Sequence, residues 1–298
     1  MALPLTRSFT VSLAALLLSM LSGCASFKSV DSFAQTGQQM TAAFPPIANA
    51  TVDSCMNNEL RRNLISTDGF DPAAAEQQAR RGCDKIANSN QKILLLNSVL
   101  ARYAQALQDL SGSKVADYHD QFSGLGDALG SIPVPGSGTP LLDPGQVSIV
   151  MKLSEQLSRL LTQNIQKSAI NELLAQQEAI GIITNALNTY VQAAYRDRIA
   201  IERRDSSVLH MALHETARAE PLATNYVRVR LYRDEKQLGE RAKIPDSYAR
   251  AVKAFQESLD SLRKSRDDSA QLQQQLKDFS LRVDELKLQV AFLASATW

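Results

Sequence analysis

Apolar residues recur three and four positions apart along most of this chain, which is the spacing of one face of an α-helix. Such stripes cover residues 72–110 and much of 147–218. The most regular stripe lies near the C-terminus, where the spacing alternates between four and three as in a coiled-coil seam. Its members are Leu272, Leu276, Phe279, Val283, Leu286, Val290 and Leu293. The pattern predicts an all-α protein built from long helices.

Prolines and polar runs divide the stripes into predicted helices. Pro45 and Pro46 are expected to end a first helix over 31–44, and a second helix follows over 47–65. Residues 246–294 are expected to form one last helix, in which the polar run before the seam projects beyond the bundle. A helix of about 40 to 50 residues is about 60–75 Å long. We therefore expect an elongated bundle of antiparallel helices rather than a globule.

One segment interrupts the helical periodicity. Residues 227–232, Val-Arg-Val-Arg-Leu-Tyr, alternate between apolar and polar as a strand does. The sequence offers no partner strand, so we interpret the segment as helix. A turn is expected between Gly239 and Pro245, and a short helix is expected over 114–122.

Residues 123–145 hold six glycines and four prolines, with Asp127 and Asp143 as their charged residues. This loop separates a helical hairpin region, residues 31–122, from a long-helix region, residues 146–298, that packs on it. Such long loops are usually functional or disordered. We favour a connector folded over one end of the bundle; the other interpretation is a flexible tip that inserts into a partner or a bilayer. The possible contact residues are Phe122, Leu125, Leu129, Ile132 and Val134.

The N-terminus has the layout of a secretory signal, because the positive charge of Arg7 precedes an uncharged run over 8–23 that contains five leucines. Serines and threonines interrupt this run, so it is a poor permanent span, which needs about 20 predominantly apolar residues. The run ends in Leu21-Ser22-Gly23-Cys24. This ending resembles the lipobox of bacterial lipoprotein precursors.

The resemblance implies that a signal peptide, residues 1–23, is removed and that Cys24 receives fatty acyl chains such as palmitate. Residues 24–30 would then form a short tether. Two or three acyl chains are ample for stable anchoring. Ala25 is not the aspartate associated with inner-membrane retention in this class, so the outer membrane is favoured. The alternative is an ordinary signal peptide with a chance cysteine.

Two further cysteines, Cys55 and Cys83, are expected to form a disulfide, since exported compartments are oxidising. A dense cluster of turn residues lies between them, and Gly69 is fourteen residues from each. Two antiparallel helices joined at this turn would bring the thiols to the same height. Asp71 would then cap the second helix, and Pro72 would be its first residue. Two unpaired buried thiols are the alternative.

Charge excludes one class of function. Without residues 1–23 the chain has 31 Lys and Arg residues and 31 Asp and Glu residues, so its formal charge is zero. The sequence therefore lacks the excess of positive charge that is typical of nucleic-acid-binding proteins. The charge-rich stretch over 196–205 mixes both signs, and we interpret it as a solvated helix face; a polar docking surface is the alternative.

Candidate chemistry is sparse. His210 and His214 lie one helical turn apart, as a metal-binding pair would, but the glutamate of a zincin motif is missing between them and no third ligand is evident. We interpret them as surface or interface histidines and keep them as weak metal candidates. The adjacent Tyr118, His119 and Asp120 would point in different directions on a helix. The sequence has neither a Gly-x-Ser-x-Gly elbow nor a phosphate-binding loop.

These features favour a non-enzymatic lipoprotein, anchored in the outer membrane on its periplasmic face or at the cell surface. It would act as a scaffold or accessory subunit through contacts with an envelope protein whose identity stays open. We expect no cofactor, nucleic acid or small-molecule substrate. The alternative is a membrane-active protein, similar to pore-forming helical proteins, that uses the 123–145 loop. An enzyme or metal protein using His210 and His214 is least favoured.

Overall fold

The structure is a computed structural model that describes residues 7–64, 69–112, 125–134, 137–160, 166–264 and 269–294; of residues 7–26 it describes only the backbone. Within these ranges the chain is helical almost throughout and has no strand, only an isolated bridge between Pro133 and Pro140. The predicted all-α class is confirmed. No described helix is both long and apolar enough to serve as a membrane span.

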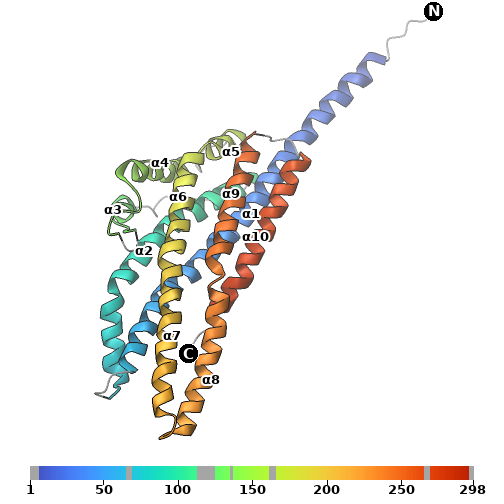
Figure 1. Cartoon of the computed structure of the whole chain (residues 1–298). Coiled ribbons are helices and arrows are strands. Elements are labelled where there is room, and N and C mark those ends of the chain that lie inside the picture. Colours follow the sequence, from blue (N-terminus) through green and yellow to red (C-terminus); the bar gives the residue numbers. More distant parts are fainter. Residues whose placement is uncertain are drawn as a thin grey trace, which may run out of the picture.

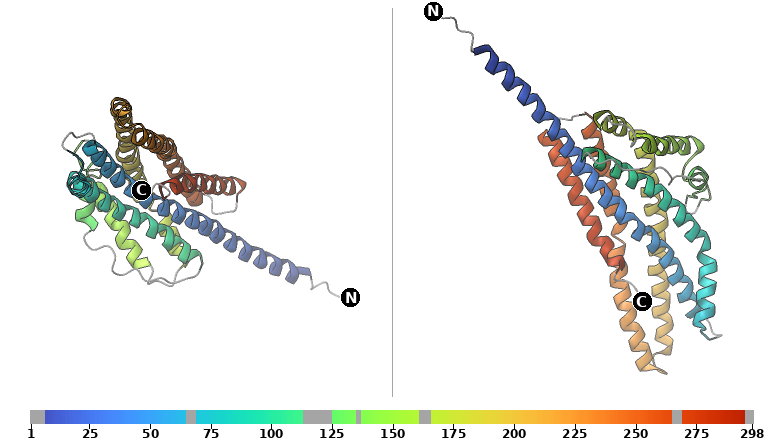
Figure 2. Two further views of the ribbon diagram at one scale, coloured as in Figure 1. Left: turned by 90° about the horizontal axis from the view of Figure 1, so that it is seen from below. Right: turned by 180° about the vertical axis from the view of Figure 1, so that it is seen from behind.

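The long helices lie along a common axis, and α3, α4 and α5 lie across one end of them (Figures 1 and 2). Helix α1 is the spine, because it contacts α2, α7, α9 and α10. Its N-terminal part extends beyond the bundle, and the α7–α8 turn lies at the opposite end of the molecule (Figure 1). The elements are α1 (Arg7–Leu64), α2 (Pro72–Ser111), α3 (Leu125–Gly130), α4 (Pro144–Leu160), α5 (Gln166–Leu174), α6 (Gln177–Tyr190), the π-helical turn η1 (Val191–Tyr195), α7 (Arg196–Thr216), α8 (Pro221–Arg241), α9 (Ile244–Lys264) and α10 (Ala270–Ala294).

Helix α1 continues through Pro45 and Pro46, so the predicted break at these residues is wrong. A proline has no N–H, and Pro45 therefore leaves the carbonyl of Thr41 without its helical donor. The side chain of Asn97 on α2 supplies a replacement, since its Nδ2 donates to the Thr41 carbonyl at 3.0 Å. Pro46 frees the carbonyl of Ala42 in the same way, and Ala42 is exposed to solvent. The buried carbonyl thus has a protein donor, and the second carbonyl belongs to a residue that solvent can reach.

The bundle also begins earlier than the sequence predicts. The backbone over 24–30, expected to be a tether, is part of α1, and Ser29 and Val30 at its end are buried. The Nε2 of Gln273 on α10 donates to the Ser29 hydroxyl at 3.1 Å. Val30 and Phe33 lie three residues apart, so the apolar stripe of α1 starts before the expected helix boundary.

The hairpin of α1 and α2 confirms the predicted disulfide and cap. Cys55 and Cys83 are bonded, with their Cα atoms 6.0 Å apart. The Oδ1 of Asp71 accepts from the backbone amides of Ala73 and Ala74 in the first turn of α2, at 2.9 and 3.3 Å. Gly69 has a positive φ of 83°, which glycine adopts without steric cost. The predicted short helix over 114–122 lies outside the described residues.

The C-terminal region is a helical hairpin rather than one helix. Helix α9 ends at Lys264 and α10 begins at Ala270, and the two helices pack against each other. Residues 264–269 contain no apolar side chain that would hold a continuous helix on the core. The predicted seam of α10 does face the core, since its residues are buried except for half-buried Leu293. Residues 227–232 are helical as interpreted, and the turn predicted between Gly239 and Pro245 is present at residues 242–243, with Gly239 itself inside α8.

Aromatic rings join the spine to the C-terminal hairpin. The ring of Phe33 lies 4.9 Å from that of Phe255 and 5.8 Å from that of Phe279, between ring centroids. Gly37 lets the helices approach this closely, because a Cβ there would be 3.3 Å from both the Cβ of Ala104 and the ring of Phe255. The core is therefore centred on α1.

A π-helical turn links α6 to α7. Tyr190 and Tyr195 are both buried, although residues five apart in an α-helix differ by 140° in direction. The wider π turn brings them closer to one face. The hydroxyl of Tyr190 donates to the Oδ1 of Asn90 at 3.4 Å, and that of Tyr195 donates to the carbonyl of Arg241 at 3.1 Å. The π turn thus keeps both tyrosines toward the buried face of the long helix that α6 and α7 form together.

The role of Asn97 can be tested with a double-mutant cycle. Asn97→Ala should lower the free energy of unfolding by about 1–3 kcal/mol, because it leaves the buried Thr41 carbonyl without a donor. In a Pro45→Ala background the restored N–H can bond to that carbonyl, so the same substitution should cost clearly less. Urea denaturation of the four proteins measures the coupling. An equal cost in both backgrounds would show that Asn97 does not compensate for the proline.

Candidate functional site

The residues singled out in the sequence do not gather at one place. His210 on α7 pairs with Glu235 on α8, with 3.1 Å between Nε2 and Oε1, while His214 is exposed. The described residues contain no group of three histidine, cysteine, aspartate or glutamate side chains placed to hold a metal. Cys24 lies on the part of α1 whose side chains are outside the described residues. So do four of the other candidates: Tyr118, His119, Asp120 and Phe122.

The Gly/Pro-rich loop turns its apolar side chains into the bundle. Leu125, Leu129 and Ile132 are buried in the main core, and Val134 is half-buried. Lys92 of α2 holds the loop from outside, since its Nζ donates to the carbonyl of Ser131 at 3.4 Å. This arrangement agrees with the connector that we favoured and leaves these leucines no free surface.

The stretch over 196–205 is only partly a solvated face. Glu202 is 2% exposed and lies between α1, α7 and α8, so the sequence interpretation is wrong at this residue. Its carboxylate lies 3.6 Å from the Nη1 of Arg61 and 3.3 Å from the Nη1 of Arg241. Ser54 donates to the same carboxylate at 2.7 Å. A buried ionic cluster therefore joins the three helices.

Charges in this ionic cluster are balanced. Asp234 provides the second carboxylate, 3.5 Å from the Nη2 of Arg61. Burial raises the pKa of Asp234 above its ordinary value, and the neighbouring Arg61 opposes the shift. The ion pairs thus join two arginines to two carboxylates, and the neighbouring Arg230 and Asp53 add one charge of each sign. Because the groups neutralise one another inside the body, we assign the cluster a structural role in holding the α7–α8 hairpin on the spine.

The outer face of α8 carries an unpartnered apolar stripe. Leu222, Tyr226 and Val229 follow one another at helical spacing, and Leu231, nine residues after Leu222, points to the opposite, buried side. The stripe also includes Tyr232, whose ring lies 4.9 Å from the Nζ of Lys236. Its members Leu222, Tyr226, Val229 and Tyr232 are between 53% and 85% exposed. Several large exposed apolar side chains gathered on one helix face are typical of interaction sites.

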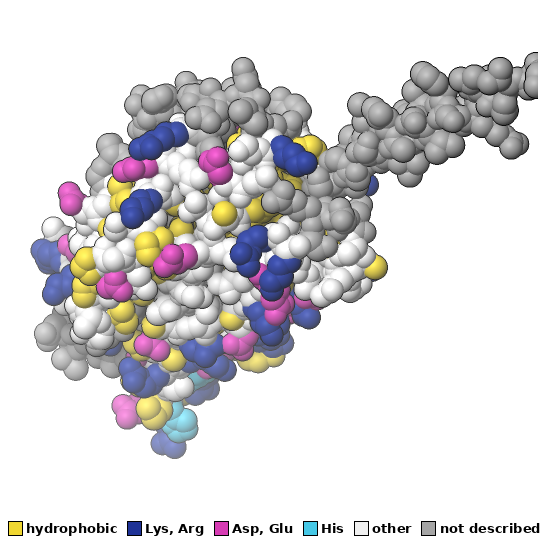
Figure 3. Space-filling model, turned by 90° about the horizontal axis from the view of Figure 1, so that it is seen from above, with side chains coloured by type: hydrophobic (Ala, Val, Ile, Leu, Met, Phe, Trp, Pro, Cys, Tyr) yellow, Lys and Arg dark blue, Asp and Glu magenta, His cyan; other side chains and the backbone are white. Residues whose placement is uncertain are grey.

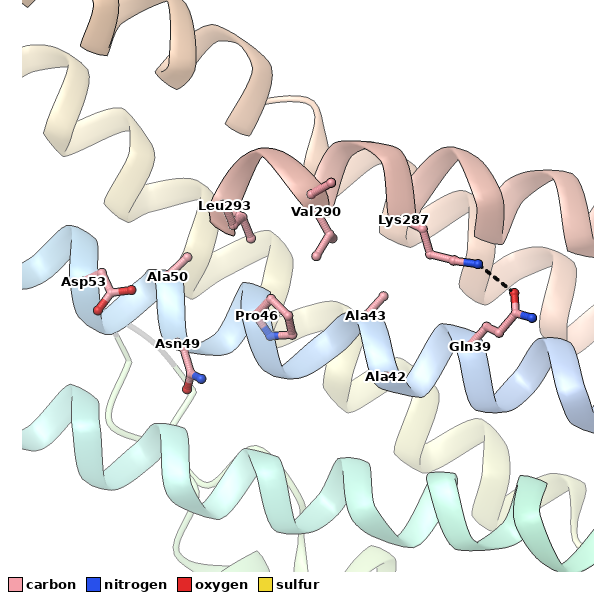
Figure 4. A pocket seen from close by; sticks show the side chains of 11 residues that line it. Gln39, Ala42, Ala43, Pro46, Asn49, Ala50, Asp53, Lys287, Val290 and Leu293 are labelled. Atoms are coloured by element: carbon pink, nitrogen blue, oxygen red, sulfur yellow. Dashed lines mark hydrogen bonds between the residues drawn. The ribbon is translucent and has the colours of Figure 1, made fainter. Parts of the chain in front are cut away.

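A groove of about 510 Å³ runs between α1 and the end of α10 (Figure 4). Its walls are mainly small apolar side chains, among them Ala43, Pro46 and Ala50. The Nζ of Lys287 reaches across it and donates to Gln39 at 3.1 Å. The groove is a concave surface, but its lysine already bonds to Gln39 within the protein. It therefore has little with which to recognise a ligand.

The rest of the surface is mixed in character. The face seen from above shows lysine and arginine interspersed with aspartate and glutamate (Figure 3). Many charged residues of the described part of the chain form pairs within one helix, such as Arg80 with Glu76. Such exposed pairs contribute little to stability.

Comparisons with protein-family models, with curated proteins and with solved structures found no match for this chain. Function therefore has to be argued from the molecule itself. Sequence reasoning missed the stripe although it interpreted residues 227–232 as helix. Helical spacing places Leu222, Tyr226 and Val229 on one face, but it does not tell whether that face is buried or exposed.

The ionic cluster predicts a large effect for a small change. Glu202→Gln keeps the shape of the side chain but leaves Arg61 and Arg241 with one buried carboxylate, so the free energy of unfolding should fall by about 3–5 kcal/mol. The matched control, Glu76→Gln, breaks an exposed pair and should cost less than about 1 kcal/mol. Urea denaturation measures both. Similar costs for the two variants would contradict the assigned role of the cluster.

Proposed function

We propose that this chain is a lipoprotein, acylated at Cys24 and anchored in the outer membrane, that acts without catalysis as a docking subunit for another envelope protein. The observation that carries the proposal is the exposed stripe on α8. The lipobox-like sequence Leu21-Ser22-Gly23-Cys24 supports the anchor.

The composition of the stripe favours a protein partner. Tyrosine and arginine are enriched among the residues that dominate binding energy at protein interfaces, and exposed Arg233 lies beside Tyr226 and Val229 on the outer face of α8. The stripe belongs to a rigid helix, so binding would order few additional side chains. A complementary apolar surface with a polar rim would bury it without disturbing the bundle.

The position of the stripe also favours a partner away from the anchoring bilayer. Cys24 lies on the N-terminal part of α1, and the α7–α8 turn lies at the other end of the molecule (Figure 2). The 40 residues from Cys24 to Leu64 span roughly 60 Å as helix. A lipid at Cys24 would therefore hold the stripe well clear of the membrane that carries it.

The membrane-active alternative draws no support from the loop over 123–145. Leu125, Leu129 and Ile132 would have to leave the core before they could enter a bilayer. Moving each of these three side chains out of the core would cost on the order of 1.5–3 kcal/mol of burial free energy. Docking through α8 requires no such rearrangement.

The anchor is tested by metabolic labelling with palmitate in a bacterium that processes lipoproteins. The full chain should be labelled and should fractionate with the outer membrane, whereas Cys24→Ala should lose both label and membrane association. Ala25→Asp is the matched control, which should keep the label but shift the protein toward the inner membrane. Retention of label by Cys24→Ala would contradict the proposal.

The docking surface is tested by site-specific photocrosslinking in the same cells. A photoreactive amino acid at Val229 should give an adduct with a second protein, while the same group at Leu288, a still more exposed residue of α10, should not. Leu222→Ser with Tyr226→Ser should abolish the adduct and leave the unfolding midpoint unchanged, because both side chains are exposed. Equal adducts from both positions, or adducts only with a second copy of this chain, would contradict a docking role toward another protein.

A further inference from the structure

A second cavity, of about 400 Å³, lies between the first hairpin and the rod formed by α6 and α7. Its walls come from α1, α2, the Gly/Pro-rich loop, the π turn and the start of α7. Small-molecule pockets in proteins occupy about 300–1,000 Å³ and are mostly apolar. This cavity has the size and composition of such a pocket, with Ile86, Val134 and Ile201 among its apolar residues.

Two unusual backbone segments keep this space open. The Gly/Pro-rich loop forms one wall as a narrow hairpin, in which the Val134 amide donates to the Thr139 carbonyl and the Leu141 amide donates to the Ile132 carbonyl, both at 2.7 Å. The π turn forms another wall and presents only Ala193 and Ala194 to the cavity. Single π turns inside helices are frequent at functional sites. The Gly/Pro-rich loop, which interrupts the helical pattern of the sequence, thus forms part of the cavity wall.

The polar groups deep in the wall are already engaged within the protein. The Thr51 hydroxyl donates to the Ile47 carbonyl at 3.2 Å, and the Tyr190 hydroxyl donates to Asn90. Burial raises the pKa of Tyr190 to about 12, so its hydroxyl keeps its proton at neutral pH. The interior therefore suits an apolar chain rather than a polar ligand.

Charged side chains line the cavity where it meets solvent. Lys85 of α2 is exposed and Arg198 of α7 is half-buried, and Asp197 is the acidic residue beside them. The lining thus carries one net positive charge. An anionic group at this opening would meet two cations and one carboxylate, so the balance of charge favours an anion over a cation.

We infer that this cavity binds a single-chain amphiphile, with its apolar chain against Ile86, Val134 and the alanines of the π turn and its anionic head near Lys85 and Arg198. A carboxylate and a phosphate head share this chemistry. The inference is independent of the docking proposal, since the cavity lies away from the stripe on α8 and involves neither Cys24 nor acylation.

The experiment uses photoactivatable, clickable twelve-carbon probes on membranes that contain the full chain. The probes carry a carboxylate, a phosphate or a trimethylammonium head, and mass spectrometry maps the labelled peptides. The carboxylate or the phosphate probe should label peptides that line the cavity, and the trimethylammonium probe should label them at least about fivefold less. Whichever anionic probe labels more strongly identifies the source as a fatty acid or a lipid phosphate.

Two variants separate the cavity from general membrane partitioning. Ala194→Trp fills the apolar space, and Lys85→Glu with Arg198→Glu reverses the charge at the opening; each should reduce anionic labelling of the cavity peptides by about fivefold or more. The matched control is Lys253→Glu, an exposed lysine on α9, which should leave labelling unchanged. Equal labelling by all three probes would overturn the inference. So would labelling that survives charge reversal in a protein with an unchanged unfolding midpoint.

Discussion

The carbonyl of Thr41 has to find a hydrogen-bond donor for α1 to pass through Pro45, and the buried amide of Asn97 supplies it. An unsatisfied carbonyl at this depth would favour a bend, and a bend would separate the aromatic contacts of α1 with α9 from the disulfide farther along the helix. Because α2, α7, α9 and α10 all pack on α1, their mutual arrangement depends on this one helix continuing through its prolines. A polar contact between two helices thus underlies an otherwise apolar core.

The ionic cluster extends the same dependence to the α7–α8 hairpin. Arg61 lies three residues before the end of α1, and it meets Glu202 of α7 and Asp234 of α8 there. Buried ion pairs are weak sources of net stability, because desolvation offsets much of the attraction. Their contribution here is geometric, because a shift of α7 or α8 along α1 would separate at least one of the paired charges. The ion pairs therefore hold α8 in position on α1, and with it the stripe on the outer face of α8.

Features that depend on neighbouring residues could be predicted from the sequence, and features that depend on distant partners could not. The seam of α10, the Asp71 cap and the Cys55–Cys83 disulfide follow from local spacing and turn chemistry, and the structure has all three. The passage of α1 through its prolines depends on Asn97, more than 50 residues away. The burial of Glu202 depends on two arginines from other helices, and the exposure of the stripe depends on which face of α8 packs against its neighbours.

The π turn between α6 and α7 absorbs one extra residue in a long helix. Five residues at the π spacing turn through about the same angle as four α-helical residues, so deleting one residue within Val191–Tyr195 would restore a regular helix and leave α7 facing as it does now. A one-residue deletion between Arg196 and Glu202 has no such outlet, because it would rotate the rest of α7 by about 100° and turn Glu202 away from Arg61. Over evolutionary time the chain should therefore vary in length at the π turn and in the turn between α7 and α8 at residues 217–220, but not between Arg196 and Glu202.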